Sequence, residues 1–227
     1  MSEKIENKDI FLNIVNKNIK RDGIKNLIKF LEDSDFFTAP ASANYHSNEV
    51  GGLLKHSLAV YKYLVEKSKF YKLDYPIETL SIVGLFHDLC KINFYKIDDE
   101  EATEKQIGYL KSLIINKCFS IPDKCTKKYA SLLIEYFKND NSGDVPKEES
   151  SFVIDDKFPL GHGEKSLYFV GKYIDLTEDE ALAIRWHMSS FDVGDTSKYA
   201  LAEAKNKSKL VNLLISTDLE VASLLNI

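Results

Sequence analysis

Apolar side chains recur every three to four residues along most of this chain, the spacing that gathers them on one face of an α-helix. The first such repeat joins Ile10, Phe11, Ile14, Val15 and Ile19. The helical segments predicted in this way cover 10–19, 24–31, 53–68, 77–88, 101–117, 124–138, 167–173, 177–187 and 208–225. The pattern therefore predicts an all-α fold, a helical bundle with one irregular, partly helical insertion.

Glycine, proline and capping residues mark the breaks between these segments. Gly51-Gly52 opens a strong helix, and Thr177-Glu-Asp-Glu180 has the residue order of a capping box. The region 93–156 is the least regular part of the chain, and Ser151-Phe-Val-Ile154 within it reads as a short strand. The expected organisation is one domain over 1–227, with N-terminal helices and a loop in 1–50 and an insertion over 93–156.

Composition narrows the class of protein. The chain has 227 residues, of which 44% are apolar and 29% charged, the balance of a globular domain. The net charge of -5 does not favour long duplex nucleic acid as a partner, whereas a small phosphorylated ligand held through a metal is compatible with it. No apolar run reaches membrane-spanning length, and the N-terminus lacks a signal-peptide core. With three cysteines read as reduced thiols, we expect a cytoplasmic protein without a membrane partner.

Residues that could bind a metal occur inside the apolar helical segments. His87 and Asp88 lie within the apolar run 81–91, His56 lies on the preceding helix, and Asp218 lies on the last one. Imidazoles and carboxylates are costly to bury unless something pairs with them, and a divalent cation would satisfy several at once. If the helices pack side by side, these four residues form a candidate metal site.

These residues also carry a resemblance to a known family. Gly51-Gly-Leu-Leu-Lys-His56-Ser, His87-Asp-Leu-Cys-Lys91 and the distant Asp218 resemble the signature of the HD phosphohydrolase superfamily. Further segments similar to motifs of a bacterial and phage subgroup are 36–42 with His46, Gly161-His-Gly-Glu-Lys-Ser166 and Ala183-Ile-Arg-Trp-His-Met188. The resemblance covers roughly 24–92 and 152–225, and it implies an HD-type helical bundle.

The resemblance implies a set of metal ligands by position. Those of a first ion would be His56, His87, Asp88 and Asp218. In family members with two ions, Asp88 would bridge them, and His162 and His187 occupy the places of the two further histidines. The dinuclear site is favoured; in the mononuclear alternative these two histidines contact substrate phosphate instead. Nitrogen and oxygen ligands favour Mn²⁺, Fe²⁺, Co²⁺ or Ni²⁺, with Mg²⁺ possible.

The implied activity is hydrolysis of a phosphate ester or phosphodiester by metal-activated water. By resemblance, the substrate is a small phosphorylated molecule, a nucleotide above all, or a single-stranded nucleic-acid end. Two alternatives stay open. The protein could be a module that senses a nucleotide without turning it over, or the metal could serve only to hold the bundle together.

Several neighbouring residues are candidates for supporting roles, each with a plainer alternative. Lys91 could hold substrate phosphate or pair with Asp88, or it could only compensate the helix dipole. Glu164 could orient water or protonate the leaving group, or could only compensate a helix N-terminus. The candidate substrate contacts are His46, Lys91, Lys165 and Arg185. His46 could instead be only a hydrogen-bonded surface imidazole, and for Arg185 a structural salt bridge is favoured.

Overall fold

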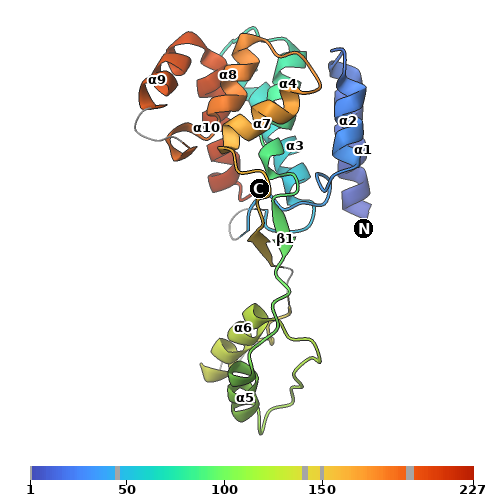
Figure 1. The fold of residues 1–227 in the computed structure, drawn as a ribbon, viewed down its shortest axis with the longest axis vertical. Coiled ribbons are helices and arrows are strands. Elements are labelled where there is room, and N and C mark those ends of the chain that lie inside the picture. Colours follow the sequence, from blue (N-terminus) through green and yellow to red (C-terminus); the bar gives the residue numbers. More distant parts are fainter. Residues whose placement is uncertain (1, 44–46, 140–142, 149–150, 193–196) are drawn as a thin grey trace. The chain divides into compact units, whose positions relative to one another are not determined.

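A computed structural model describes residues 2–43, 47–139, 143–148, 151–192 and 197–227. In these residues the chain forms ten α-helices, two short 3₁₀-helices and one two-stranded sheet, so the predicted all-α class is confirmed. No helix among them is both long and apolar enough to cross a membrane. The chain divides into two compact units, one made of Met1–Tyr95 with Ile154–Ile227 and the other of Lys96–Val153 (Figure 1). The second unit lies within the segment 93–156 that the sequence pattern set apart.

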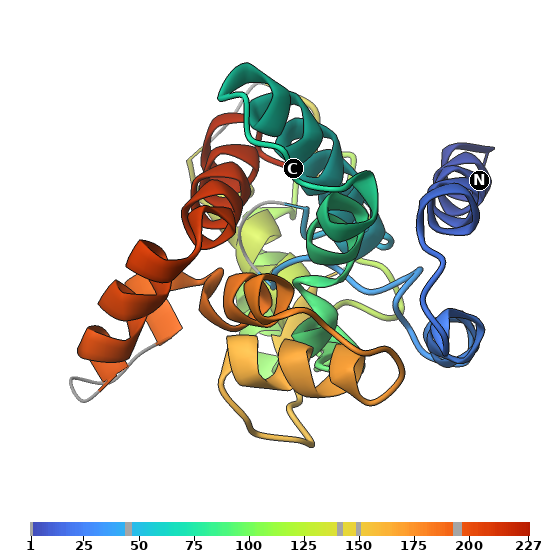
Figure 2. The same ribbon diagram turned by 90° about the horizontal axis from the view of Figure 1, so that it is seen from above.

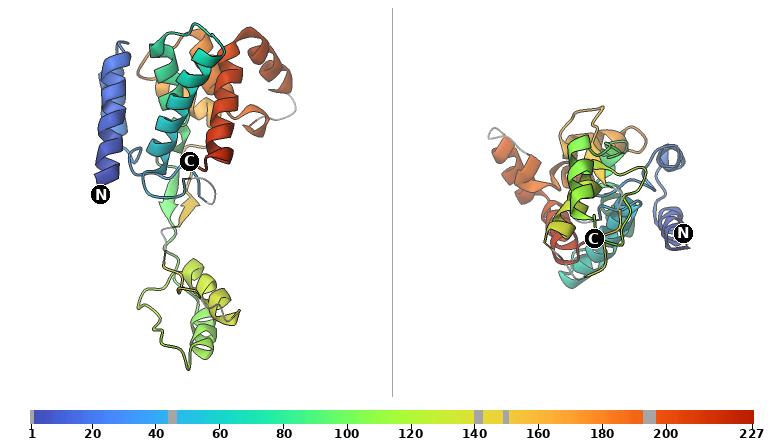
Figure 3. Two further views of the ribbon diagram at one scale, coloured as in Figure 1. Left: turned by 180° about the vertical axis from the view of Figure 1, so that it is seen from behind. Right: turned by 90° about the horizontal axis from the view of Figure 1, so that it is seen from below.

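Four helices form the centre of the first unit: α3 (Gly52–Phe70), α4 (Ile77–Phe86), α8 (Glu178–Trp186) and α10 (Lys209–Leu224). Helix α3 packs against α4 and α10, and α8 packs against the same two helices. Figure 3 shows α3 and α10 side by side. Every residue of α4 from Thr79 to Phe86 is buried, because α1, α3 and α8 all contact it. This buried helix leads directly to His87 and Asp88.

The remaining helices of the first unit cover this centre. They are α1 (Ser2–Asn18), α2 (Ile24–Glu32), α7 (His162–Gly171) and α9 (Lys198–Lys207), with the 3₁₀-helices η1 (Leu89–Lys91) and η2 (Ser189–Asp192). Helix α1 packs on α3 and α4, and α7 packs on α8 and η1. In Figure 2, α1 and α2 lie on one side of the unit and α9 lies on the other.

The second unit has its own small core. Helices α5 (Glu104–Leu113) and α6 (Lys127–Lys138) pack against each other. The buried side chains between them are Leu110, Tyr129, Ala130, Leu133 and Phe137. Two short strands, β1 (Tyr95–Ile97) and β2 (Phe152–Ile154), pair with each other, and β2 confirms the predicted strand.

Some predicted helix boundaries are wrong, and hydrogen-bonding caps explain two of them. Helices α5 and α6 each begin three residues later than predicted, because the Thr103 and Thr126 side chains accept the first N–H groups there. Helix α7 begins at His162 instead of 167, since the Lys165 N–H already bonds to the Gly161 carbonyl oxygen. Helix α9 was not predicted; only Leu201 and Ala204 are buried along it, so its apolar signal is weak.

Two glycines allow helices near the site to approach closely. A Cβ atom on Gly84 would lie 2.7 Å from Tyr61 Cα, so the backbones of α4 and α3 lie close together there. A Cβ atom on Gly163 would lie 1.8 Å from the Arg185 carbonyl oxygen, where α7 meets α8. Any larger residue at either position would push apart helices that carry candidate site residues.

We expect Gly163→Ala to lower the free energy of unfolding by about 2 kcal/mol, because a backbone carbonyl cannot move aside for the added methyl group. Gly171→Ala in the same helix is the matched control, since nothing lies within 4 Å of a Cβ there. That control is expected to be neutral or slightly stabilising. Urea unfolding of both variants measures the difference; equal stabilities would show that α7 and α8 are not in close contact.

A buried ion pair joins the α1–α2 connection to the centre of the first unit. Both Glu180 carboxylate oxygens lie 2.9 Å from Arg21 guanidinium nitrogens, and the Thr79 hydroxyl donates to the same carboxylate at 2.8 Å. The Thr177 N–H donates to it as well, which completes the predicted capping box of α8. Glu180 is fully buried, and its carboxylate connects α8 to two distant parts of the chain, at Arg21 and Thr79.

Candidate metal centre

Three histidines and two aspartates from four elements meet at the centre of the first unit. His56 comes from α3, His87 and Asp88 follow α4, His187 follows α8, and Asp218 comes from α10. The three imidazole side chains are fully buried, and the Asp88 and Asp218 side chains are 2% and 16% exposed. The structure therefore brings together five of the six side chains that the sequence predicts as metal ligands. We call these five residues the His/Asp cluster.

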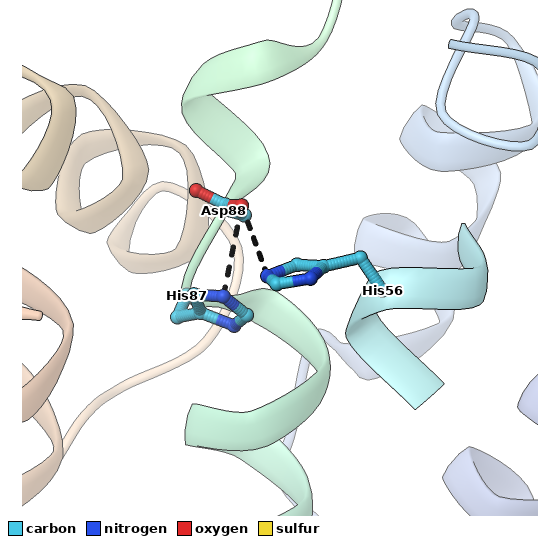
Figure 4. A group of neighbouring side chains, drawn as sticks. All are labelled: His56, His87 and Asp88. Carbon is cyan, nitrogen blue, oxygen red and sulfur yellow. Dashed lines mark ion pairs between the residues drawn. The ribbon is translucent and has the colours of Figure 1, made fainter. Parts of the chain in front are cut away.

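Asp88 lies between the histidines. Its Oδ2 atom is 3.7 Å from His56 Nε2 and 3.6 Å from His87 Nε2 (Figure 4). Its other oxygen, Oδ1, is 3.4 Å from His187 Nε2. Ligand atoms of His56, His87 and Asp88 all lie within 4.8 Å of one another, close enough for a single ion to bind all three.

Asp218 closes the cluster from α10. Its Oδ1 atom lies 2.9 Å from His56 Nε2 and 3.6 Å from His87 Nε2. These two rings therefore each face one oxygen from Asp88 and one from Asp218. Two nitrogen and two oxygen donors around one point are a suitable ligand set for a divalent transition metal.

Backbone carbonyl groups fix which ring nitrogen of each histidine carries hydrogen. The Nδ1 atoms lie 2.8 Å from the Ile227 oxygen for His56, 3.0 Å from the Gly84 oxygen for His87 and 2.7 Å from the Ile184 oxygen for His187. A carbonyl oxygen can only accept, so each Nδ1 must donate. In a neutral ring, Nε2 then presents its lone pair to the cluster, which is the orientation that metal-binding histidines have.

The Nε2 atoms of His87 and His187 face groups that cannot donate to them, whereas His56 Nε2 lies within hydrogen-bonding distance of Asp218 Oδ1, at 2.9 Å. His87 Nε2 and His187 Nε2 are buried and form no hydrogen bond, although carboxylate oxygens lie 3.4–3.6 Å away. Buried polar atoms normally have a partner, and two acceptors facing each other repel. Either a proton on the ring or a cation between the groups would relieve this arrangement.

His87 and His187 are held by the same local structure. Each is the C-cap residue of its helix, and each Nδ1 donates to the carbonyl three residues earlier. That carbonyl would otherwise accept the next helical N–H, so both helices end and a 3₁₀-helix follows. The prediction that the helix runs through His87 and Asp88 is therefore wrong: α4 ends at Phe86.

The His/Asp cluster carries a net negative charge when its histidine rings are neutral. Burial raises the pKa of Asp88, but the charges of Lys91 and His87 outweigh it and hold that pKa well below its usual value. Burial likewise raises the pKa of Asp218, but the neighbouring His56 and His87 rings outweigh it and hold that pKa below its usual value. With neutral rings, the two carboxylates face a single ammonium group, that of Lys91, 2.6 Å from Asp88 Oδ2. A divalent cation would reverse this imbalance.

His162 lies beside the cluster and contacts Cys90, which was not among the predicted site residues. Its Nδ1 atom is 3.3 Å from Cys90 Sγ, and Cys90 Sγ is 3.7 Å from Asp88 Oδ1. The Cys90 N–H donates to the buried Ser166 hydroxyl, which fixes η1 against α7. Burial raises the pKa of the Cys90 thiol. Cys90 could have been selected from the sequence, because it stands only two residues after Asp88.

The other candidate residues form local ion pairs. Lys165 is buried, lies 2.6 Å from Asp156 Oδ1 and sits over the Phe94 ring. Arg185 forms an ion pair with Glu164 and stacks on the Trp186 ring at 4.1 Å, so the favoured salt bridge is present. His46 lies outside the described residues.

The Ile227 main-chain oxygen that orients His56 is placed by the chain after α10. Asn226 adopts a left-handed conformation with φ of 60°, and the Ile227 N–H donates to the Val221 oxygen at 3.2 Å. This turn brings the Ile227 oxygen back to His56, a contact between residues 171 positions apart. Sequence reasoning missed it because a main-chain acceptor leaves no mark in residue type.

Ending the chain at Leu225 is expected to weaken Mn²⁺ binding about 10- to 100-fold, since His56 would lose the carbonyl that orients it. Ile227→Ala is the matched control, because it trims the side chain and keeps the main-chain oxygen. Isothermal titration with Mn²⁺ gives both affinities. If the shortened chain binds as tightly as the control, the carbonyl does not orient a ligand.

Comparison of the chain with protein-family models, curated proteins and solved structures gave no match. The geometry of the His/Asp cluster and the sequence motifs are therefore the basis for inferring a function.

Proposed function

We propose that the His/Asp cluster binds at least one divalent metal ion and that the protein is a metal-dependent phosphohydrolase of the HD type. One observation carries the proposal: buried Nε2 lone pairs, fixed by backbone carbonyls, converge on two carboxylates. The resemblance of the motifs around His56, His87 and Asp218 to the HD signature supports the same conclusion.

The donor set fits a first ion better than a second. His56, His87, Asp88 and Asp218 would hold one ion, since their donor atoms surround one point. A second position would use Asp88 Oδ1 and His187, with His162 beyond Cys90. Asp88 would thus bridge two ions, as the dinuclear interpretation requires. Donors of this kind suit Mn²⁺, Fe²⁺, Co²⁺ or Ni²⁺, and Mg²⁺ is possible.

A bound ion would polarise a phosphoryl oxygen and lower the pKa of a coordinated water. The residues of the chain would do the rest. The three histidines and two aspartates hold their donor atoms in place before substrate arrives, so little reorganisation is needed. Lys91 lies at the mouth of the cluster and would bind a phosphate oxygen, which has the same charge as its present partner Asp88.

The test is hydrolysis of a panel of phosphate monoesters, phosphodiesters and nucleotides with Mn²⁺ or Co²⁺, comparing wild type with His87→Ala. We expect turnover of at least one ester by the wild type and its loss in the variant. Equal turnover by both proteins would contradict the proposal. Nucleotide binding without turnover under any metal would favour the sensing module instead.

A further inference from the structure

A pocket of about 880 Å³ opens directly onto the His/Asp cluster. Lys91, His187 and Asp218 line it on the cluster side. Its other walls come from η2 with the preceding Met188, and from α10 with the turn that follows it. A pocket of this size is within the usual range for small-molecule sites, and a nucleoside fits in it.

The wall away from the cluster is apolar and exposed. It is formed by Met188, Phe191, Ile215, Leu219 and Ala222. The Phe191 and Leu219 residues are 82% and 56% exposed. An exposed apolar surface of this kind indicates a binding site for an apolar or aromatic group.

The rim adds hydrogen-bonding groups that a hydrocarbon would leave unpaired. Asn226, Ser189 and Ser223 line the pocket next to the apolar wall. Asn226 offers both a donor and an acceptor, and the two hydroxyl oxygens can accept. A flat ring with polar edges matches this combination, since Phe191 can stack on its face while the rim bonds its edge.

Charge limits how many phosphate groups the pocket accepts. Among the lining residues that the structure describes, Lys91 alone is positive, and its ammonium is 2.6 Å from Asp88. Asp218 adds a negative charge on the same side. One phosphate would be held at the metal. Among the described residues, a longer polyphosphate tail would find one further cation near the pocket, Lys205, whose ammonium already donates to the Ser189 hydroxyl at 3.1 Å, and it would also meet the negative charge of Asp218.

We infer that this pocket binds the nucleoside part of a nucleotide with one phosphate group, with Phe191 and Leu219 contacting the base. The inference rests on the proposed function, because the reacting phosphate is placed by the metal. It goes beyond that function in naming the group that is recognised and in expecting one phosphate to be preferred over three.

The experiment compares three compounds with Mn²⁺: ribose 5-phosphate, which has no base, adenosine 5′-monophosphate, and adenosine 5′-triphosphate. We expect kcat/KM for the monophosphate to exceed that for ribose 5-phosphate roughly 10- to 100-fold, the range that base stacking supplies. Phe191→Ala and Leu219→Ala should lower this ratio several-fold. Phe70→Ala, which removes an equally exposed ring at the end of α3, should leave it unchanged.

Binding of adenosine, which has no phosphate, separates this inference from the proposed function. Titration calorimetry should detect adenosine binding to the wild type and weaker binding to Phe191→Ala. If adenosine binds in this way but no ester is hydrolysed, the pocket is supported and the hydrolase proposal fails. If esters are hydrolysed with a ratio near one, or the triphosphate is preferred, the pocket inference is overturned and the hydrolase proposal stands.

Discussion

Asp88→Asn is expected to remove most of the Mn²⁺ affinity of the protein and at least about 10³-fold of the kcat/KM for any phosphate ester that it hydrolyses. The carboxylate contributes donor atoms to both proposed metal positions, and Lewis-acid stabilisation of phosphoryl transfer amounts to several kcal/mol. Asparagine keeps the shape of the side chain, so packing around it changes little. Steady-state kinetics and Mn²⁺ titration measure the two losses.

The control for this substitution is Asp155→Asn, which removes a carboxylate paired with the exposed Lys157 side chain at 3.4 Å. It should change neither Mn²⁺ affinity nor kcat/KM. Thermal unfolding without metal shows whether Asp88→Asn is folded. A folded Asp88→Asn protein with wild-type metal affinity would show that Asp88 is not a ligand.

Glu180→Ala should lower the free energy of unfolding by about 3 kcal/mol. Removing one partner from a buried ion pair leaves the other without compensation, and the lower end of the usual range applies because Arg21 can reach water. The variant also loses the Thr79 hydrogen bond and the capping box of α8. Urea unfolding, with the m-value checked for change, gives the difference.

Glu178→Ala, two residues earlier in α8, is the comparison for Glu180→Ala. It removes the same side chain, but the Glu178–Lys207 pair is exposed, so little loss of stability is expected. If the two variants unfold at the same urea concentration, the buried pair does not connect the α1–α2 link to α8.

The helices were predictable wherever a face of the helix is buried. Val15, Leu27 and Leu64 lie at helical spacing with their neighbours and are buried in α1, α2 and α3. The end of α4 was not predictable from this pattern, because a histidine side chain takes the carbonyl of Gly84. Such competition between side chain and backbone depends on one rotamer and leaves the apolar spacing unchanged.

The candidate site followed from residue types, but its detail depends on tertiary contacts. His56, His87, Asp88 and Asp218 could be selected because ionisable residues stood in apolar helices. The contact between His162 and Cys90 could not, because it arises where α7 packs on η1. The pairing of Lys165 with Asp156 has the same origin, since a charge pattern does not reveal which ion pair a fold will bury.

Elemental analysis of protein purified without chelator tests most directly whether the His/Asp cluster is a metal site. We expect one to two equivalents of a transition metal per chain in the wild type, near two if Asp88 bridges two ions, and a marked loss in Asp88→Asn. A wild-type protein with no bound transition metal, and with no measurable affinity for added Mn²⁺, Co²⁺ or Fe²⁺, would contradict the account.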